Sequence, residues 1–163
     1  MELRIERQDE GTERWVEIDL WGKALGNKQA ALDLEIGEWL LAARDAQVHR
    51  YMGCASFIEY ARRRLGLDPH SIHERVRVAD ALLGLPLTRQ ALARGERSWT
   101  AVRELTRVAT PETEAAWLSD TEGRTAKDVQ DLVAGRRPGQ TARDPADPRL
   151  VRHVLRLEVS SEA

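Results

Sequence analysis

The spacing of apolar residues changes along the chain, and each spacing predicts a different element. Near the N-terminus Leu3 and Ile5 alternate with polar residues, and Val16, Ile18 and Leu20 do the same. Alternation with a period of two is typical of an extended segment with one covered face. We therefore expect residues 1–26 to form an extended or irregular N-terminal segment.

From about residue 28 to residue 49 the spacing becomes helical. One apolar stripe contains Leu32, Ile36, Trp39, Leu40, Ala43 and Ala46, and a second stripe, on the opposite side, contains Leu34, Leu41 and Val48 at intervals of seven. A helix that is apolar on two faces is either central to its domain or shared with a partner chain. Central packing is the favoured interpretation. The alternative is a homodimer interface formed by Leu34, Leu41 and Val48.

Two further helices are predicted with clear ends. Residues 56–59, Ser-Phe-Ile-Glu, match a capping box at a helix start, and Gly66 is suited to end that helix. Asp68 and Pro69 supply the cap and first turn of the next helix. Its predicted inner stripe is Ile72, Val76, Ala79 and Leu83, and its outer face carries His70, Glu74 and Arg77, with His73 at the flank.

Short helices are predicted downstream, from Pro86 to Gly95, from Ser98 to Val108, after Thr110 and from Thr125 to Gly135. Residues 136–148 contain three prolines and predict a linker. Residues 149–163 alternate like a strand, either pairing with the N-terminal segment or opening a domain that the chain lacks. The expected fold is therefore mainly α, an orthogonal multi-helix bundle over residues 27–135 with short extended segments at the termini.

Composition favours a soluble, intracellular chain. Its 163 residues are 42% hydrophobic and 32% charged, no apolar run approaches a membrane span, and charged residues follow Met1. The single cysteine, Cys54, forms no internal disulfide, which favours a reducing compartment such as the cytoplasm. We expect no membrane association.

The charge is unevenly distributed along the chain. Residues 1–49 carry six basic and eleven acidic side chains, residues 50–107 carry eleven and six, and residues 108–163 carry eight and ten. The basic middle suggests binding to a polyanion, since arginine and lysine near phosphates release counterions. A solvated basic face is the alternative interpretation.

The pair of helices joined at Gly66 predicts a helix-turn-helix-like unit. In such a unit the second helix enters the major groove of double-stranded DNA and the first lies near the backbone. Arg62, Arg63 and Arg64 are then candidates for phosphate contacts, and His70, Ser71, His73 and Arg77 for the recognition face, supported downstream by Arg97, Arg103 and Arg107. The position four residues before Gly66, normally small, is Arg62, so an ordinary helix pair stays an equal alternative.

Two resemblances favour the nucleic-acid interpretation. Leu85-Pro86, a short helix, Gly95 and the capped helix after Ser98 resemble the segment that follows the helix-turn-helix in ParB/KorB-type partition proteins. Residues 53–60, 64–67, 77–79, 95–109 and 131–137 resemble the helical region that precedes HNH endonuclease modules in many high-GC bacteria, the domain-of-unknown-function 222 type. This second resemblance implies that the chain is the N-terminal part, or a stand-alone relative, of such a protein.

The nuclease itself is not visible in the sequence. An HNH site needs a histidine base, further metal ligands and usually an asparagine, whereas the chain has four histidines and one asparagine, Asn27, outside any such context. His70 and His73 have the spacing of two ligands but lack a third. We therefore expect no catalytic residue, metal or cofactor in this chain. The expected function is DNA binding or targeting, and the alternative is a helical interaction or dimerisation module without a nucleic-acid role.

Overall fold

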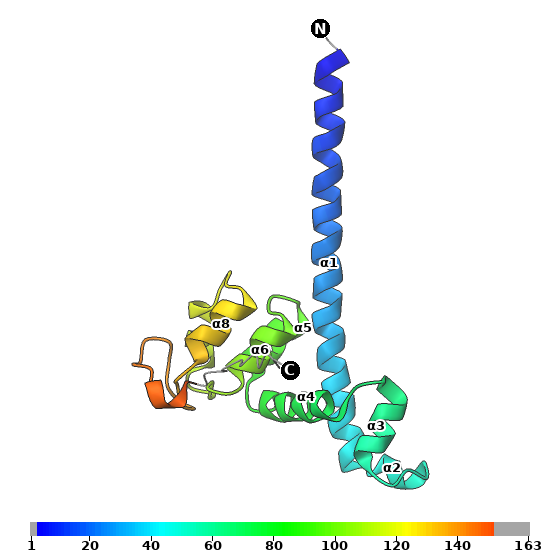
Figure 1. Ribbon diagram of the computed structural model, residues 1–163. Coiled ribbons are helices and arrows are strands. Elements are labelled where there is room, and N and C mark those ends of the chain that lie inside the picture. The colour runs from blue at the N-terminus through cyan, green and yellow to red at the C-terminus, as the bar shows by residue number, and fades with distance from the viewer. Residues whose placement is uncertain (1–2, 152–163) are drawn as a thin grey trace, which may run out of the picture.

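The computed structural model describes residues 3–151, with side chains described from residue 13 onward, and within that range the chain is all-α, as expected. One long helix rises from a small bundle of short helices (Figure 1). The described elements are α1 (Leu3–Asp45), α2 (Val48–Tyr51), α3 (Phe57–Leu65), α4 (Pro69–Leu82), α5 (Pro86–Ala93), α6 (Trp99–Leu105), α7 (Glu114–Asp120), α8 (Ala126–Val133) and a 3₁₀ turn, η1 (Pro148–Leu150).

The prediction of an extended N-terminal segment is wrong, because residues 3–26 belong to α1. No proline precedes Pro69, so nothing in the backbone chemistry stops a helix that runs from Leu3 to Asp45. The alternation that suggested an extended segment covers only two apolar positions in one run and three in the other. Ile18 and Leu25 also share one face of a helix, and that helical spacing is the one the chain adopts.

The second half of α1 packs at the centre of the bundle. Ala30, Leu34 and Leu41 are buried there against the other helices. Gly37 brings α1 close to α4, since a methyl group at Gly37 would lie only 3.0 Å from the Cβ of Ala79. Leu34 and Leu41, the alternative homodimer residues, are thus packed centrally within the single chain, and Val48 is half-buried at the start of α2.

An ion pair reinforces the contact between α1 and α4. The Arg75 guanidinium donates to Asp33 Oδ1 at 2.7 Å, and both side chains are largely buried. The same guanidinium lies over the Trp99 ring, 4.7 Å from its centre. α1, α4 and α6 are therefore held together by one arginine.

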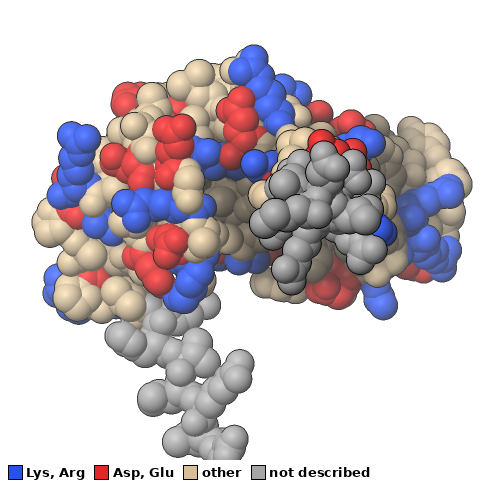
Figure 2. Space-filling model, turned by 90° about the horizontal axis from the view of Figure 1, so that it is seen from above, with Lys and Arg blue, Asp and Glu red and all other residues tan. Residues whose placement is uncertain are grey.

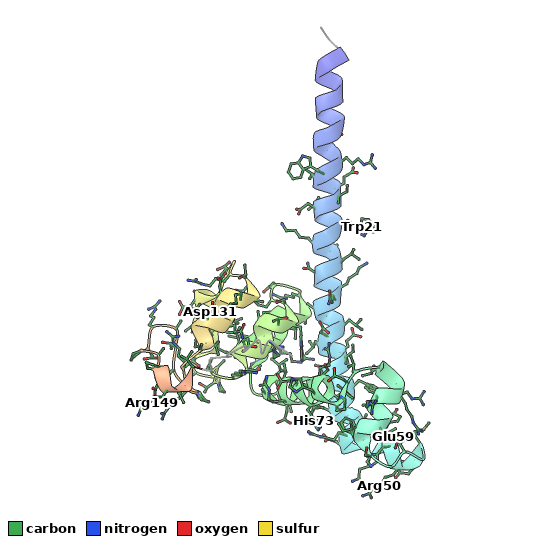
Figure 3. All side chains as sticks on the ribbon, in the orientation of Figure 1. Trp21, Arg50, Glu59, His73, Asp131 and Arg149 are labelled. Atoms are coloured by element: carbon green, nitrogen blue, oxygen red, sulfur yellow. The ribbon has the colours of Figure 1, made fainter. Side chains whose placement is uncertain are left out.

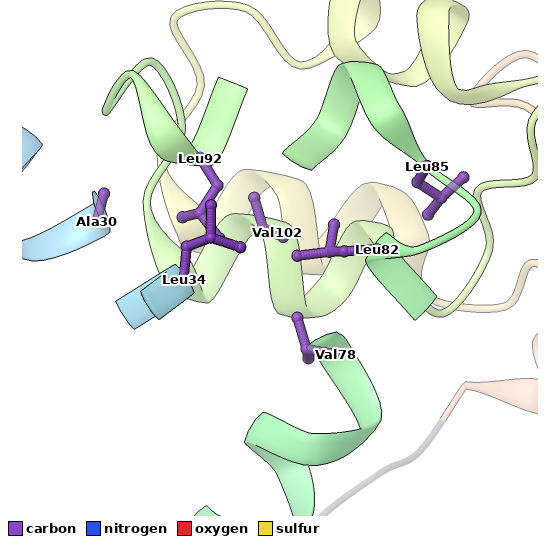
Figure 4. Close-up of a cluster of buried hydrophobic side chains, with 7 residues drawn as sticks. All are labelled: Ala30, Leu34, Val78, Leu82, Leu85, Leu92 and Val102. Atoms are coloured by element: carbon purple, nitrogen blue, oxygen red, sulfur yellow. The ribbon is translucent and has the colours of Figure 1, made fainter. Parts of the chain in front are cut away.

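Three apolar clusters form the core. The first joins α1, α4, α5 and α6 through the seven side chains of Figure 4, which are Ala30, Leu34, Val78, Leu82, Leu85, Leu92 and Val102. The second surrounds Trp117 and links α6, α7 and α8. The third joins α1, α3 and α4 through Leu40, Ala61 and Ile72.

The predicted inner stripe of α4 is correct at two positions and wrong at its end. Ile72 and Ala79 are buried as expected, but Leu83 is 75% exposed and its neighbour Leu82 is buried. α4 packs against four other helices, α1, α3, α5 and α6, so its covered face turns from one neighbour to the next and includes Val78. A sequence pattern interpreted as one straight stripe does not predict this change of the covered face along α4.

The expected linker, residues 136–148, lies against the bundle. Gln140 accepts from Trp117 Nε1 at 2.9 Å through its carbonyl, and the Arg136 guanidinium donates to the carbonyls of Thr141 and Ala142. The predicted C-terminal strand begins in η1, a 3₁₀ turn. The remainder of that prediction, including His153, lies outside the described residues.

None of the described helices combines the length and apolar character of a membrane span.

Candidate nucleic-acid interface

Local sequence chemistry sets both ends of α3. Ser56 Oγ accepts from the backbone N–H of Glu59 at 3.1 Å, while Glu59 Oε2 accepts from the N–H of Ala55 at 2.7 Å. This is the predicted cap, except that Glu59 reaches one residue further back. Gly66 ends the helix in the left-handed conformation, with φ of 67°, as expected. These ends place the three arginines in the last turn of α3.

Arg62, Arg63 and Arg64 are all exposed on α3. Arg62 has no ion pair among the described side chains, and the Arg64 guanidinium lies 5.6 Å from the centre of the Tyr60 ring. Within residues 13–151, Arg63 is the one of the three that forms an ion pair, with Glu59, and its side chain is still 62% exposed. The first helix of the predicted unit therefore presents cationic groups to solvent.

The start of α4 is equally well defined. Asp68 Oδ1 accepts from the N–H of Ser71 at 3.0 Å and Asp68 Oδ2 accepts from the Ser71 hydroxyl at 2.6 Å. The Ser71 hydroxyl, followed by the Ser71 N–H, holds the pKa of Asp68 below its usual range. His70 and His73 are exposed beside this cap, and Ser71 is half-buried.

A groove of about 510 Å³ separates the end of α3 from the start of α4. Arg62 and Arg63 line one side, and residues 66–69 line the other. Two carboxylates, those of Glu59 and Asp68, also line it. The groove thus offers two guanidinium groups to an anion, but its potential is reduced by the acidic pair.

Arg77, by contrast, is used inside the chain. Its guanidinium donates to Glu74 Oε1 at 3.1 Å, to the carbonyl of Arg103 at 3.1 Å and to Thr106 Oγ1 at 3.2 Å. The Arg77 hydrogen bond holds the pKa of Glu74 below its usual range, against the opposing effect of burial. These contacts tie α4 to α6 and leave Arg77 with few donors for a base edge.

Arg103 and Arg107 belong to the same network. Arg103 pairs with the buried Glu104 at 2.8 Å, and Arg107 lies 3.5 Å from Glu104 and 3.8 Å from Glu74. Arg107 remains half-exposed. The basic spacing on α6 that suggested phosphate contacts is therefore largely balanced by two glutamates.

Arg97 is also engaged in hydrogen bonds within the chain. It donates to the carbonyl of Leu118 at 2.8 Å and to the carbonyl of Glu96 at 2.9 Å, joining the loop before α6 to α7. Of the ten predicted nucleic-acid residues, Arg62 and Arg63 line the groove at the end of α3, whereas His70 and Ser71 line a second pocket, together with Arg103, and His73 is exposed on the first turn of α4. Arg64 lies on the Tyr60 side of α3, and Arg77, Arg97, Arg103 and Arg107 are engaged elsewhere.

Arg50 is an exposed basic residue that was not among the predicted contacts. Arg50 lies on α2, at the same end of the molecule as Glu59 of α3 (Figure 3). In the sequence Arg50 is a single basic residue shortly before Ser56. Its position beside α3 depends on the packing of α2 against α3, which the sequence pattern did not predict. In Figure 2, seen from above, basic side chains gather at the right-hand edge of the molecule, whereas elsewhere on the visible face both signs are interspersed.

No cluster of three or more metal-binding side chains occurs in the described part of the chain. Comparison of the chain with protein-family models, with curated proteins and with solved structures finds no match in any of the three.

Proposed function

We propose that the chain binds double-stranded DNA through α3 and α4, acting as a helix-turn-helix-like pair within an orthogonal bundle. The observation that carries the proposal is the exposure of three consecutive arginines at the end of α3, next to the exposed histidines at the start of α4. In this arrangement Arg62, Arg63 and Arg64 contact phosphates. His70, Ser71 and His73 face the groove of the duplex.

The state of the arginines supports this assignment. A guanidinium without a carboxylate partner exchanges only water and counterions when it meets a phosphate, and the released counterions favour binding. Arg62 and Arg64 satisfy that condition among the described residues, and Arg63 shares one exposed carboxylate. Arg77 and Arg103 do not, so the proposed interface is smaller than the sequence predicted.

The support for proposing a targeting role is the resemblance of residues 95–109 and 131–137 to the region before HNH endonuclease modules. The proposed chain recognises or positions DNA and performs no catalysis. Cleavage belongs to a separate nuclease module.

The test is the salt dependence of binding to a fluorescent duplex. The logarithm of the affinity should fall with the logarithm of salt by about 0.9 for each phosphate contact, so a triple variant, Arg62→Ala, Arg63→Ala and Arg64→Ala, should reduce the slope by about 2 to 3. A matched triple variant removes the same charge from exposed arginines outside α3, Arg94→Ala, Arg143→Ala and Arg149→Ala. Absence of binding at low salt, or an equal effect of both variants, contradicts the proposal.

A second candidate function is supported by a separate observation. Large apolar side chains are exposed along the first half of α1, including Trp15, Trp21 and Leu25. They favour an interaction module, on a different face of the helix from the predicted residues Leu34 and Leu41.

A further inference from the structure

The first half of α1 stands clear of the bundle and carries an apolar face. Figure 1 shows this part of the helix rising alone above the other elements. Ile18 is 56% exposed and Leu25 is 50% exposed, and the same face continues into the second half of the helix, where Leu32 is 55% exposed. An isolated helix gains nothing by presenting branched apolar side chains to water at a regular spacing, so this spacing points to a partner.

The spacing is that of a coiled coil. Ile18, Leu25, Leu32 and Trp39 follow one another at intervals of seven, which makes them d positions of a heptad. The corresponding a positions are Trp15, Gly22, Gln29 and Ile36. We call the free part of this face the α1 seam, defined as Trp15, Ile18, Gly22, Leu25, Gln29 and Leu32.

The bundle leaves the α1 seam uncovered and ends it at Leu32. Ala30, Leu34 and Leu41 face the bundle, and all six seam residues are exposed. Beyond Leu32 the heptad positions are covered by the chain itself. Ile36 packs in the third core cluster, and the Trp39 ring lies 5.8 Å from the Tyr60 ring of α3. The seam is therefore about 26 Å long at 1.5 Å per residue.

We infer that two copies of the chain associate through the α1 seam as a parallel, two-stranded coiled coil. The flanking charges fit this occupant. Arg14 is at position g and Asp19 is at position e, five residues later, and in a parallel pair a g residue faces the e residue of the following heptad on the other helix. Each copy therefore sets its Arg14 against Asp19 of the other copy.

The shape of the chain also favours the parallel orientation. In an antiparallel pair, with Gly22 set against Leu25, residues 8–11 of one copy would lie along Ile36 and Trp39 of the other. Those two side chains are already packed within their own chain, beside α3. In a parallel pair the two N-terminal halves run together over residues 15–32, and the pairing ends where Ile36 and Trp39 pack within their own chain.

The self-association is tested by sedimentation equilibrium of the full chain over a wide range of concentration. The mass should rise from one chain to two and stop there. Leu25→Asp, and separately Ile18→Asp, should raise the dissociation constant by at least about 100-fold, since each places a charge in an apolar interface. Leu20→Asp is the matched control, because Leu20 is 58% exposed on the outer side of the same helix, and it should change the constant by no more than about twofold.

The orientation has its own test. In a Cys54→Ala background, Gln29→Cys places the two introduced thiols opposite each other in a parallel pair, so mild oxidation should give a reducible covalent dimer, whereas Leu20→Cys should not. Arg14→Asp should weaken association by about threefold to tenfold, and adding Asp19→Arg should restore it. A chain that stays monomeric, an assembly larger than two, or a dimer unaffected by Leu25→Asp overturns the inference. A dimer that does not cross-link through position 29 overturns its parallel orientation.

Discussion

The two halves of α1 share a helical spacing of apolar residues but have very different surroundings. Both carry large apolar side chains at helical spacing and neither contains proline. In the second half Leu34 and Leu40 are buried by the bundle. In the first half Ile18 and Leu25 are 56% and 50% exposed. Apolar periodicity therefore identifies a helix face that is covered, but it does not identify the segment or molecule that covers this face. The bundle covers one half, and a second copy of the chain is our proposal for the other.

The largest predicted effect is on the free energy of unfolding when a tryptophan in each of the two regions is replaced by alanine. Trp117 is fully buried and its indole donates to the carbonyl of Gln140, while Trp21 is 67% exposed on α1. Trp117→Ala should lower the free energy of unfolding by about 3–5 kcal/mol, because a large cavity and an unpaired carbonyl are left.

Trp21→Ala is the control and should change the free energy of unfolding by less than about 0.5 kcal/mol at concentrations where the chain is monomeric. Urea unfolding followed by circular dichroism measures both. Equal losses for the two variants would show that the first half of α1 is packed in solution.

A smaller effect is expected where α1 leaves the bundle. A methyl group on Gly95 would lie 2.5 Å from the Cα of Asn27, and Gly95 also has φ of 72°. Gly95→Ala should therefore destabilise the chain by about 2–3 kcal/mol, since either α1 or the loop after α5 must move.

Gly66 distinguishes the cost of a positive φ from the cost of the close contact with Asn27. It has φ of 67° but no atom within 4 Å of an added methyl group, so Gly66→Ala should cost only about 1 kcal/mol. Thermal unfolding of the two variants measures the difference. If the costs are equal, the contact between Gly95 and Asn27 does not hold α1 to the bundle.

The smallest expected effect is on the pH dependence of stability. Arg77 lowers the pKa of Glu74 in the folded chain, so this carboxylate stabilises the fold above its unfolded pKa, and the contribution is lost as the pH falls through the folded value. Glu74→Gln should lower the free energy of unfolding by about 1 kcal/mol or less at neutral pH and have little effect at about pH 3.

Glu17→Gln on the projecting half of α1 removes one negative charge without touching the Glu74 network, so it controls for the change in net charge. Urea midpoints at the two pH values test the prediction. A destabilisation by Glu74→Gln that persists undiminished at acid pH would contradict the assigned role of the carboxylate.

The features that could be predicted from the sequence are local. The caps at Ser56, Asp68, Ser98 and Thr125 and the end of α3 at Gly66 are found where they were predicted. These features follow from a few neighbouring residues, because a cap is a hydrogen bond between a side chain and a backbone N–H two or three positions away. Such interactions need no knowledge of the rest of the fold.

Tertiary structure alone decided which faces are buried and which charges are free. Leu34 rather than Leu32 faces the bundle, Leu82 rather than Leu83 is buried, and the residues of the expected N-terminal strand became helix. Arg77 and Arg62 have the same chemistry, yet Arg77 is held by Thr106 and the carbonyl of Arg103, which are distant in sequence, whereas Arg62 has no such neighbour among the described residues. The physical reason is that burial and ion pairing depend on contacts between distant segments, and a single local pattern is compatible with several of them.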